Sequence, residues 1–307
     1  MYINNLSPVH LTIANYNVFS ASNVNDINVN HVWGMYSDNF GWDVTINNAH
    51  STICENYYFY IDAKFPDAFA HWIYESAIYL YLYIKLKEIY PTLKIYTKMK
   101  KTYKDVTYRA FNIKESDISY TIENRNNIVL FPPYISFFTN TINDNHRLYL
   151  MNFRNYLTEV DAIKKDISIL YFPRGKLENY KGNDRIILNQ DDIENVVKTY
   201  PNSYVYYTDT TTDIRDQIKL LQRANIFICD YGSNFSFNSF FCNDSHIIVL
   251  GVDNAHKTFP YSLIIHNITE KKNKSITFIP KENDKLIFSI NRLKETIKEL
   301  GLDPALI

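Results

Sequence analysis

Hydrophobic and polar positions follow two different patterns along the chain. In the first part, short runs of β-branched and aromatic residues are separated by Asn, Asp and Ser, which predicts strands at 9–13, 17–21 and 56–63. The segment 67–91 is apolar on almost every side of a helical projection. We expect one long buried helix there, with Asp67 as its N-cap and Pro91 as its stop. Further elements of this half are strands at 93–98 and 127–135 and a helix at 143–160.

After the polar stretch 161–166, strand and helix patterns alternate regularly. Strands are predicted at 167–173, 203–209, 225–230, 246–251 and 276–280, and helices at 191–201, 213–224, 236–243 and 284–301. Such alternation predicts a parallel sheet with helices on both faces, in which ligands bind at the carboxyl ends of the strands. We therefore expect an α/β protein with an N-terminal domain over 1–160 and a C-terminal domain over 161–307.

Composition narrows the class of protein. Hydrophobic residues make up 46% of the 307 residues, which is enough for a large core. A net charge of −1 favours neither nucleic acid nor an anionic membrane as a partner. Three cysteines without CxxC spacing argue against a disulfide framework and a zinc site. No apolar stretch is long enough for a membrane anchor, and no signal peptide begins the chain, so we expect a soluble, cytoplasmic protein.

The first candidate site is the turn from Asp230 to Asn234, which follows a predicted strand and precedes a helix. Gly232 allows a ligand to approach the backbone closely, and the N-terminus of the next helix favours a phosphate group. Ser233 could add a hydroxyl donor. The alternative is an ordinary strand-to-helix turn. The chain contains neither GxGxxG nor a Walker motif, which argues against hydride transfer and NTP hydrolysis.

The second candidate is a set of cations, Arg174, Lys176 and Arg185. Arg174 stands at the end of a predicted buried strand, where a guanidinium can hold a diphosphate bidentately and stabilise a leaving group. The alternative is that these are solvated loop charges.

The third candidate is the pair His71 and Glu75, which the i,i+4 spacing places on one helix face. A carboxylate that orients a histidine raises its basicity, so the pair could act as a general base. The alternative is a pair that only stabilises the helix. The pattern is not HExxH, and the chain has no Asp-x-Asp motif, so a metal ion is not required. The absence of GxSxG argues against a serine hydrolase.

Taken in order, these stretches resemble glycosyltransferase family 61. The matching positions are His71-Trp72 with Glu75, Arg174, Arg185 ahead of Asn189-Gln190, Gln217 and Ala224 at the two ends of a helix, and Tyr231-Gly232-Ser233 followed by Asn238 and Phe240. The chain departs from the family at three points. Tyr231 replaces the usual His, Gln190 replaces the usual Glu, and Asn238 is displaced by one position.

The resemblance implies a GT-B-like fold, with two Rossmann-like domains facing a cleft and a terminal helix that packs back on the first domain. It also implies an inverting transferase that moves a sugar from a nucleotide-diphosphate donor to a glycan or glycoprotein acceptor. By analogy alone the donor is a UDP-sugar, with a slight preference for UDP-xylose. The short chain without an expected anchor is closer to bacterial or large-DNA-virus members, and the Asn-, Tyr-, Ile- and Lys-rich composition suits the viral ones, which would act in the host cytoplasm.

In this interpretation Gly232, Ser233, Arg174 and Arg185 bind the diphosphate. Further donor-site candidates are Lys176, Asn189, Tyr231 and Asn234. Either His71, oriented by Glu75, or Glu75 itself deprotonates the acceptor, and neither metal nor cofactor is needed. Two other functions stay open: a non-catalytic sugar- or nucleotide-binding protein with the same fold, and a different α/β enzyme such as an NAD-dependent oxidoreductase.

Overall fold

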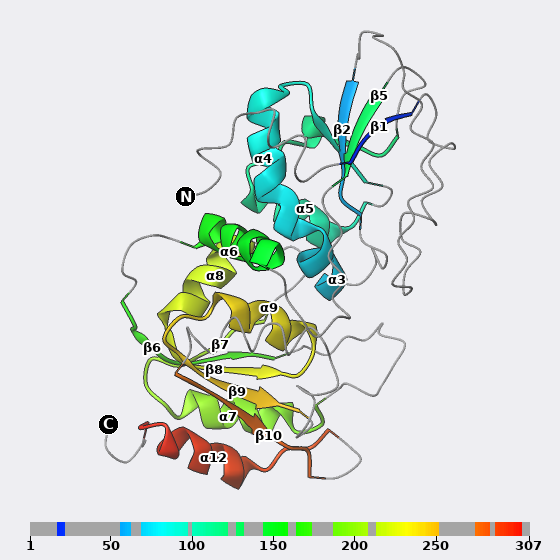
Figure 1. Cartoon of the computed structure of the whole chain (residues 1–307). Helices are drawn as coiled ribbons and strands as arrows, with labels where there is room; N and C mark the ends of the chain where they lie inside the picture. The colour runs from blue at the N-terminus through cyan, green and yellow to red at the C-terminus, as the bar shows by residue number, and fades with distance from the viewer. Residues whose placement is uncertain are drawn as a thin grey trace. The chain divides into compact units, whose positions relative to one another are not determined.

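The computed structural model describes residues 17–21, 56–62, 69–97, 100–121, 127–131, 144–158, 164–173, 187–207, 213–251, 274–282 and 286–302. The chain forms two compact units, 1–136 and 137–307 (Figure 1). Each unit has a five-stranded sheet within the described residues. The helix predicted at 143–160 therefore belongs to the second unit, and the boundary lies before it rather than at the polar stretch 161–166.

The sheet of the first unit is mostly parallel. Its strands are β1 (Asn17–Ala21), β2 (Asn56–Tyr60), β3 (Lys94–Tyr96), β4 (Ile118–Ser119) and β5 (Asn127–Phe131), in the order β1-β5-β2-β3-β4. Only the β1–β5 pair is antiparallel. Four of the predicted strands are confirmed, β4 was not predicted, and the strand predicted at 9–13 lies outside the described residues.

The helix predicted over 67–91 is broken in two. The segments are α3 (Phe69–Glu75), a 3₁₀ turn η3 (Ala77–Tyr79) and α4 (Leu80–Ile89). Ser76 leaves helical geometry, with φ −133° and ψ −60°, and the Tyr79 amide bonds the Ser76 carbonyl at 3.0 Å. All three residues of η3 are buried.

A helix that the pattern did not predict follows β3. This helix, α5 (Thr102–Ala110), is succeeded by the 3₁₀ turn η4 (Glu115–Asp117). Its buried positions include Lys104 and Thr107 alongside Val106 and Tyr108, so its inward face carries no clear apolar stripe.

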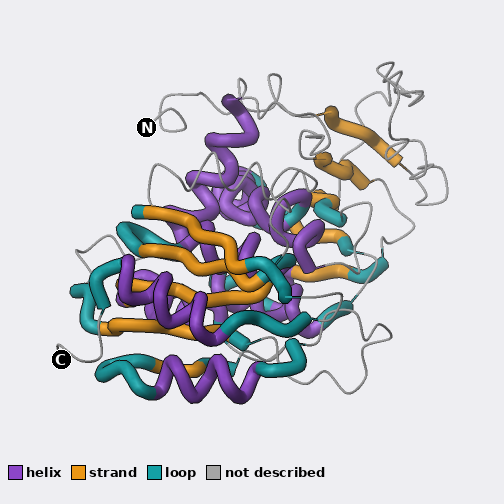
Figure 2. The backbone as a smooth tube through the Cα atoms, turned by 90° about the horizontal axis from the view of Figure 1, so that it is seen from below, coloured by secondary structure: helices purple, strands orange, loops and turns teal. Residues whose placement is uncertain are grey.

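The second unit is a three-layer α/β structure. Its strands are β6 (Ile167–Phe172), β7 (Tyr204–Val205), β8 (Ala224–Asp230), β9 (His246–Leu250) and β10 (Ser275–Ile279), in the order β10-β9-β8-β6-β7. All are parallel, as predicted. The helices are α6 (Asp144–Leu157), α7 (Gln190–Lys198), α8 (Ile214–Arg223), α9 (Ser233–Phe241) and α12 (Ile290–Glu299). Figure 1 shows α8 and α9 on one face of the sheet and α7 and α12 on the other, and Figure 2 shows the strands side by side between them.

The strand order of this sheet places a topological switch point between β6 and β8. From β6 the chain passes through α7 to β7 on one side, and then returns through α8 to β8 on the other. In open parallel sheets ligands bind outside the carboxyl ends of the strands at such a point. The ends that meet there are Phe172 and Asp230.

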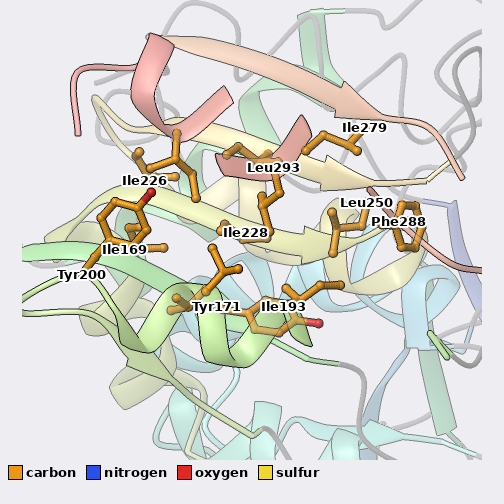
Figure 3. Close-up of a cluster of buried hydrophobic side chains, with 14 of the residues drawn as sticks. Ile169, Tyr171, Ile193, Tyr200, Ile226, Ile228, Leu250, Ile279, Phe288 and Leu293 are labelled. Atoms are coloured by element: carbon orange, nitrogen blue, oxygen red, sulfur yellow. The ribbon is translucent and has the colours of Figure 1, made fainter. Parts of the chain in front are cut away.

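The core of the second unit joins the sheet to α7 and α12. Figure 3 shows strand residues Ile169, Tyr171, Ile226 and Ile228 packed with Ile193 of α7 and Leu293 of α12. The terminal helix was expected to pack on the first domain, but Leu293 and Ile297 are buried in this second core. Gly301, with φ +91°, ends that helix as predicted.

Candidate functional site

The turn after β8 is built around a glycine. Gly232 has φ 123° and ψ −145°, a backbone conformation that is essentially restricted to glycine. It precedes α9, which has no capping side chain and no acidic residue in its first turn. The other described helices that follow strands of this sheet differ. The first turn of α7 carries Asp191 and Asp192, and α8 is capped by Asp213, which accepts from the Arg215 amide at 2.7 Å. The N-cap of α12 is Ser289, which accepts from the Arg292 amide at 3.4 Å.

These differences single out α9 as the helix start best suited to an anion. The first amides of an α-helix have no partner within the helix, and its N-terminal end carries a partial positive charge. Gly232 supplies no side-chain cap, and the first turn of α9 contains no acidic residue. The Asp230 carboxylate ahead of the helix accepts a hydrogen bond from the Asn234 side chain at 2.7 Å. The geometry therefore suits a phosphate or diphosphate group at the switch point.

The other end of α9 is anchored by a buried arginine. Arg154 of α6 donates from Nε to the carbonyl of Phe240 at 2.9 Å and from Nη2 to the carbonyl of Cys242 at 3.4 Å. Burial lowers the pKa of Arg154, which as an arginine nonetheless remains charged. A cation at a helix C-terminus interacts favourably with the helix dipole. Arg154 therefore stabilises α9 in the orientation in which the N-terminus of α9 faces the carboxyl edge of the sheet.

A chain of side-chain amides ties the two strand ends together. Asn234, in the first turn of α9, donates to the carbonyl of Phe172 at 2.9 Å and to Oδ1 of Asp230 at 2.7 Å. Its own oxygen accepts from Asn238, whose oxygen in turn accepts from Gln217 of α8. Both N–H groups of Asn234, a predicted donor-site candidate, thus join the end of β6 to the end of β8.

Tyr231 is held against the end of the neighbouring strand. Its amide bonds the Leu250 carbonyl at 2.9 Å, and its ring stacks on Phe235 with centroids 6.4 Å apart. A Cβ atom on Gly251 would lie 2.5 Å from the Cβ of Tyr231, so only glycine fits beside it. The half-buried Tyr231 side chain therefore forms part of the same edge as the α9 N-terminus.

Asn189 has a structural role in the described geometry. Its amide group donates to the Phe288 carbonyl at 2.8 Å and accepts from the Phe288 amide at 3.1 Å. This clamp fixes the segment ahead of α12 against the start of α7. The next residue, Gln190, donates to Glu194 at 3.0 Å, and Glu194 also accepts from Tyr207.

The pair predicted in the first unit is present in the structure. His71 and Glu75 both lie on α3, and His71 Nδ1 is 2.7 Å from Glu75 Oε1. Both side chains are partly buried. Because α3 follows β2, the pair stands near the carboxyl end of that strand, which is the functional edge of a parallel sheet. A carboxylate on Nδ1 fixes the tautomer in which Nε2 accepts a proton.

A buried ion pair lies behind His71. Lys104 and Asp62 are 1% and 2% exposed, and their charged atoms are 2.8 Å apart. The Lys104 ammonium also donates to Thr97 at 3.1 Å and lies 4.9 Å from the ring centroid of Trp72, the residue next to His71. The Trp72 indole donates to Thr107 of α5 at 3.2 Å. The cluster locks α3 against α5. No sequence motif surrounds Lys104, and the pattern did not reveal it.

Arg174, Lys176 and Arg185 lie outside the described residues, and of Ser233 only the backbone is described. The structure brings Gly232, Tyr231 and Asn234 together at one edge, and it pairs His71 with Glu75 in the other unit.

Neither a cluster of metal-binding side chains nor a membrane-spanning helix occurs in the described part of the chain. No group of three His, Cys, Asp or Glu side chains there is arranged to bind a metal ion. None of the described helices combines the length and the apolar character that crossing a bilayer requires.

Comparison with known proteins identifies the family. No curated protein matches the chain significantly. The family model Glycosyltransferase 61 matches residues 69–249, from the start of the His71 helix to β9, which is more than half of the 307 residues. The chain therefore belongs to glycosyltransferase family 61.

Proposed function

We propose that the protein is an inverting glycosyltransferase that moves a sugar from a nucleotide-diphosphate donor to a hydroxyl of a glycan or glycoprotein. The observation that carries this proposal is the uncapped N-terminus of α9 at the switch point of a parallel sheet, within the region that matches the family. Such a helix start is suited to the diphosphate of a sugar nucleotide.

In this proposal the two units are the two Rossmann-like domains of a GT-B enzyme. The second unit binds the donor, and the first binds the acceptor. A UDP-sugar is the proposed donor, with UDP-xylose as the first candidate by analogy with other members of the family.

The reaction is a single in-line displacement. The acceptor hydroxyl attacks the anomeric carbon, the bond from that carbon to the donor phosphate oxygen breaks, and the nucleoside diphosphate leaves with the electron pair. His71 Nε2 takes the acceptor proton, while Glu75, 2.7 Å from Nδ1, orients the ring and stabilises the imidazolium that forms. Glu75 as the base itself is the alternative.

The leaving diphosphate would be stabilised by the amides at Gly232 and Ser233 together with Arg174 and Arg185. Arginine is suited to this role because its planar guanidinium can bind two phosphate oxygens at once. These groups supply positive charge where negative charge develops, so the proposed mechanism uses no metal ion.

The function is tested by a thermal-shift screen against nucleotide sugars, followed by transfer assays with the donor that stabilises the protein most. Arg174→Ala should abolish that stabilisation. His71→Ala should lower turnover by at least about a hundredfold, within the range for loss of a general base, and leave donor affinity nearly intact. Full transfer activity in His71→Ala would show that the base is another residue.

A second candidate is a sugar- or nucleotide-binding protein that does not catalyse transfer. Its support is that Tyr231 and Gln190 stand where relatives usually have His and Glu. Calorimetry combined with a hydrolysis assay separates the two functions. Binding of a nucleotide sugar without hydrolysis or transfer would favour the binding protein.

A further inference from the structure

Tyr207 is an exposed aromatic side chain that is nevertheless fixed. It follows β7 and is 55% exposed, yet its hydroxyl donates to a carboxylate oxygen of Glu194, which is only 7% exposed. Glu194 is itself held, because it accepts from Gln190 Nε2 at 3.0 Å and from Lys198 Nζ at 3.4 Å. The ring therefore presents its surface to solvent while its far end is tied to α7.

The hydroxyl of Tyr207 remains a donor across the physiological pH range. Its hydrogen bond to Glu194 raises the pKa of Tyr207 to about 12, with burial adding to the effect. The neutral phenol and the carboxylate are therefore a matched donor and acceptor, and the ring keeps its orientation. A ring that is ordered before a ligand arrives loses less conformational freedom on binding.

Tyr207 lies at the same edge of the sheet as the N-terminus of α9. β7 pairs with β6 in parallel register, Val205 beside Tyr171, and the Tyr206 amide bonds the Tyr171 carbonyl at 2.9 Å. Tyr207 thus continues past the carboxyl end of β7, while β8 and α9 lie on the other side of β6. Strands are spaced by about 4.8 Å, so β7 and β8 are about 10 Å apart across the switch point.

We propose that Tyr207, held by Glu194, is the platform on which the nucleobase of the donor stacks while its diphosphate binds at the start of α9. This inference rests on the proposed function, since it assigns the base-binding part of the same site. Aromatic rings bind nucleobases through their π faces, and stacking tolerates different bases. The half-exposed ring is thus suited to a base without specifying which one.

The test is isothermal titration calorimetry on the whole protein with three probes: UDP, GDP and inorganic pyrophosphate. Tyr207→Ala should lower the affinity for whichever of the two nucleotides binds more tightly by about tenfold, which is within the range for loss of one stacked base. The affinity for pyrophosphate should stay within about twofold of the wild-type value. Tyr207→Phe retains the ring but not the hydrogen bond, and should weaken the nucleotide by less than Tyr207→Ala does.

Tyr204→Ala is the matched control, because Tyr204 lies in β7, the strand that Tyr207 follows, and is 51% exposed. It should leave the affinity for all three probes unchanged. Circular dichroism checks that each variant is folded, and Tyr207→Leu, which has bulk but no π face, replaces Tyr207→Ala if the latter does not fold.

The outcomes separate the two proposals. If the wild type binds neither UDP nor GDP, the proposed function fails and this inference fails with it. If the wild type binds a nucleotide and Tyr207→Ala binds it equally well, only the stacking platform is refuted. If Tyr207→Ala lost affinity for the nucleotide and for pyrophosphate to the same extent, the stacking platform would also be refuted, since the effect would then not concern the base.

Discussion

Gly251 and Tyr231 approach so closely that a single added methyl group would collide with the tyrosine. The two residues end neighbouring strands, and a Cβ atom on Gly251 would lie 2.5 Å from the Cβ of Tyr231 and 3.2 Å from its Cγ. The glycine is thus required by contact and not by its backbone angles. It makes room for the Tyr231 side chain at the end of β8.

The first prediction concerns this contact. Gly251→Ala should lower the free energy of unfolding by about 1–3 kcal/mol, because the added methyl group forces Tyr231 or the strand end to move. Urea unfolding monitored by circular dichroism measures the change. Tyr231→Gly alone and the double variant complete a cycle, because glycine lacks the Cβ atom that the new methyl group would meet. The two substitutions should be less destabilising together than their sum. Strict additivity would contradict the proposed contact.

The second prediction concerns the turn glycine. Gly232→Ala should be destabilised by about 1–3 kcal/mol, because alanine does not readily adopt φ 123° with ψ −145°. It should also weaken UDP binding, since the first amides of α9 would be displaced.

The matched control for Gly232 is Gly301→Ala. Gly301 also has positive φ, but nothing lies within 4 Å of an added Cβ, and it follows the terminal helix. This variant should lose stability without any change in UDP affinity. If Gly232→Ala bound UDP like the wild type, the anion site would not be at this turn.

The third prediction tests the ion pair behind His71. Lys104→Met should be destabilised by about 3–5 kcal/mol, because it leaves the Asp62 carboxylate buried without its cationic partner. Chemical denaturation gives the value. Lys100→Met removes the exposed ion pair with Glu115 and should cause no measurable change. Wild-type stability in Lys104→Met would mean that the pair does not lock α3 to α5.

The fourth prediction is a pH dependence. Burial lowers the pKa of His246 below its ordinary 6.5, with Lys274 contributing in the same direction and Asp244 opposing it. His246 is partly buried, and its Nδ1 lies 2.7 Å from the Ser275 hydroxyl. As the pH falls below 6.5, the unfolded chain binds a proton that the folded protein resists. Stability attributable to His246 is therefore present above pH 6.5 and is lost on acidification.

Melting temperatures at a series of pH values check the sign. Between pH 7.5 and 5.5 the wild type should lose more stability than His246→Asn, and above pH 7.5 the difference between the two proteins should be constant. If the wild type gained stability on acidification relative to His246→Asn, the pKa of His246 would be raised by folding and not lowered.

The second sheet could be predicted because its sequence signals are local. Each strand from β6 to β9 is an apolar run bounded by polar residues, and α8 has Ile214, Ile218 and Leu221 buried on one face. Asp213 and Gly301 cap their helices in the way that their residue types favour. The i,i+4 spacing alone was enough to pair His71 with Glu75.

Other features depend on contacts between distant residues. The break at Ser76 was missed because the segment is apolar on all sides. Such a segment has no polar face whose direction would change where the helix breaks. The helix α5 was missed because its buried face includes Lys104, whose partner Asp62 is 42 residues away. The hydrogen bonds of Asn189 and Asn234 could not be predicted either, since each bonds a backbone carbonyl far along the chain.

The chain of amides behind the α9 turn has a consequence for how the family can diverge. The side chain of Gln217 donates a hydrogen bond to Asn238, and the side chain of Asn238 donates one to Asn234. Asn238 and Gln217 are buried. Changing one of them alone leaves a buried polar group without its partner, which is destabilising. Substitutions at these three positions should consequently occur together in related sequences. Family members in which all three residues differ should have a different set of hydrogen bonds behind this turn.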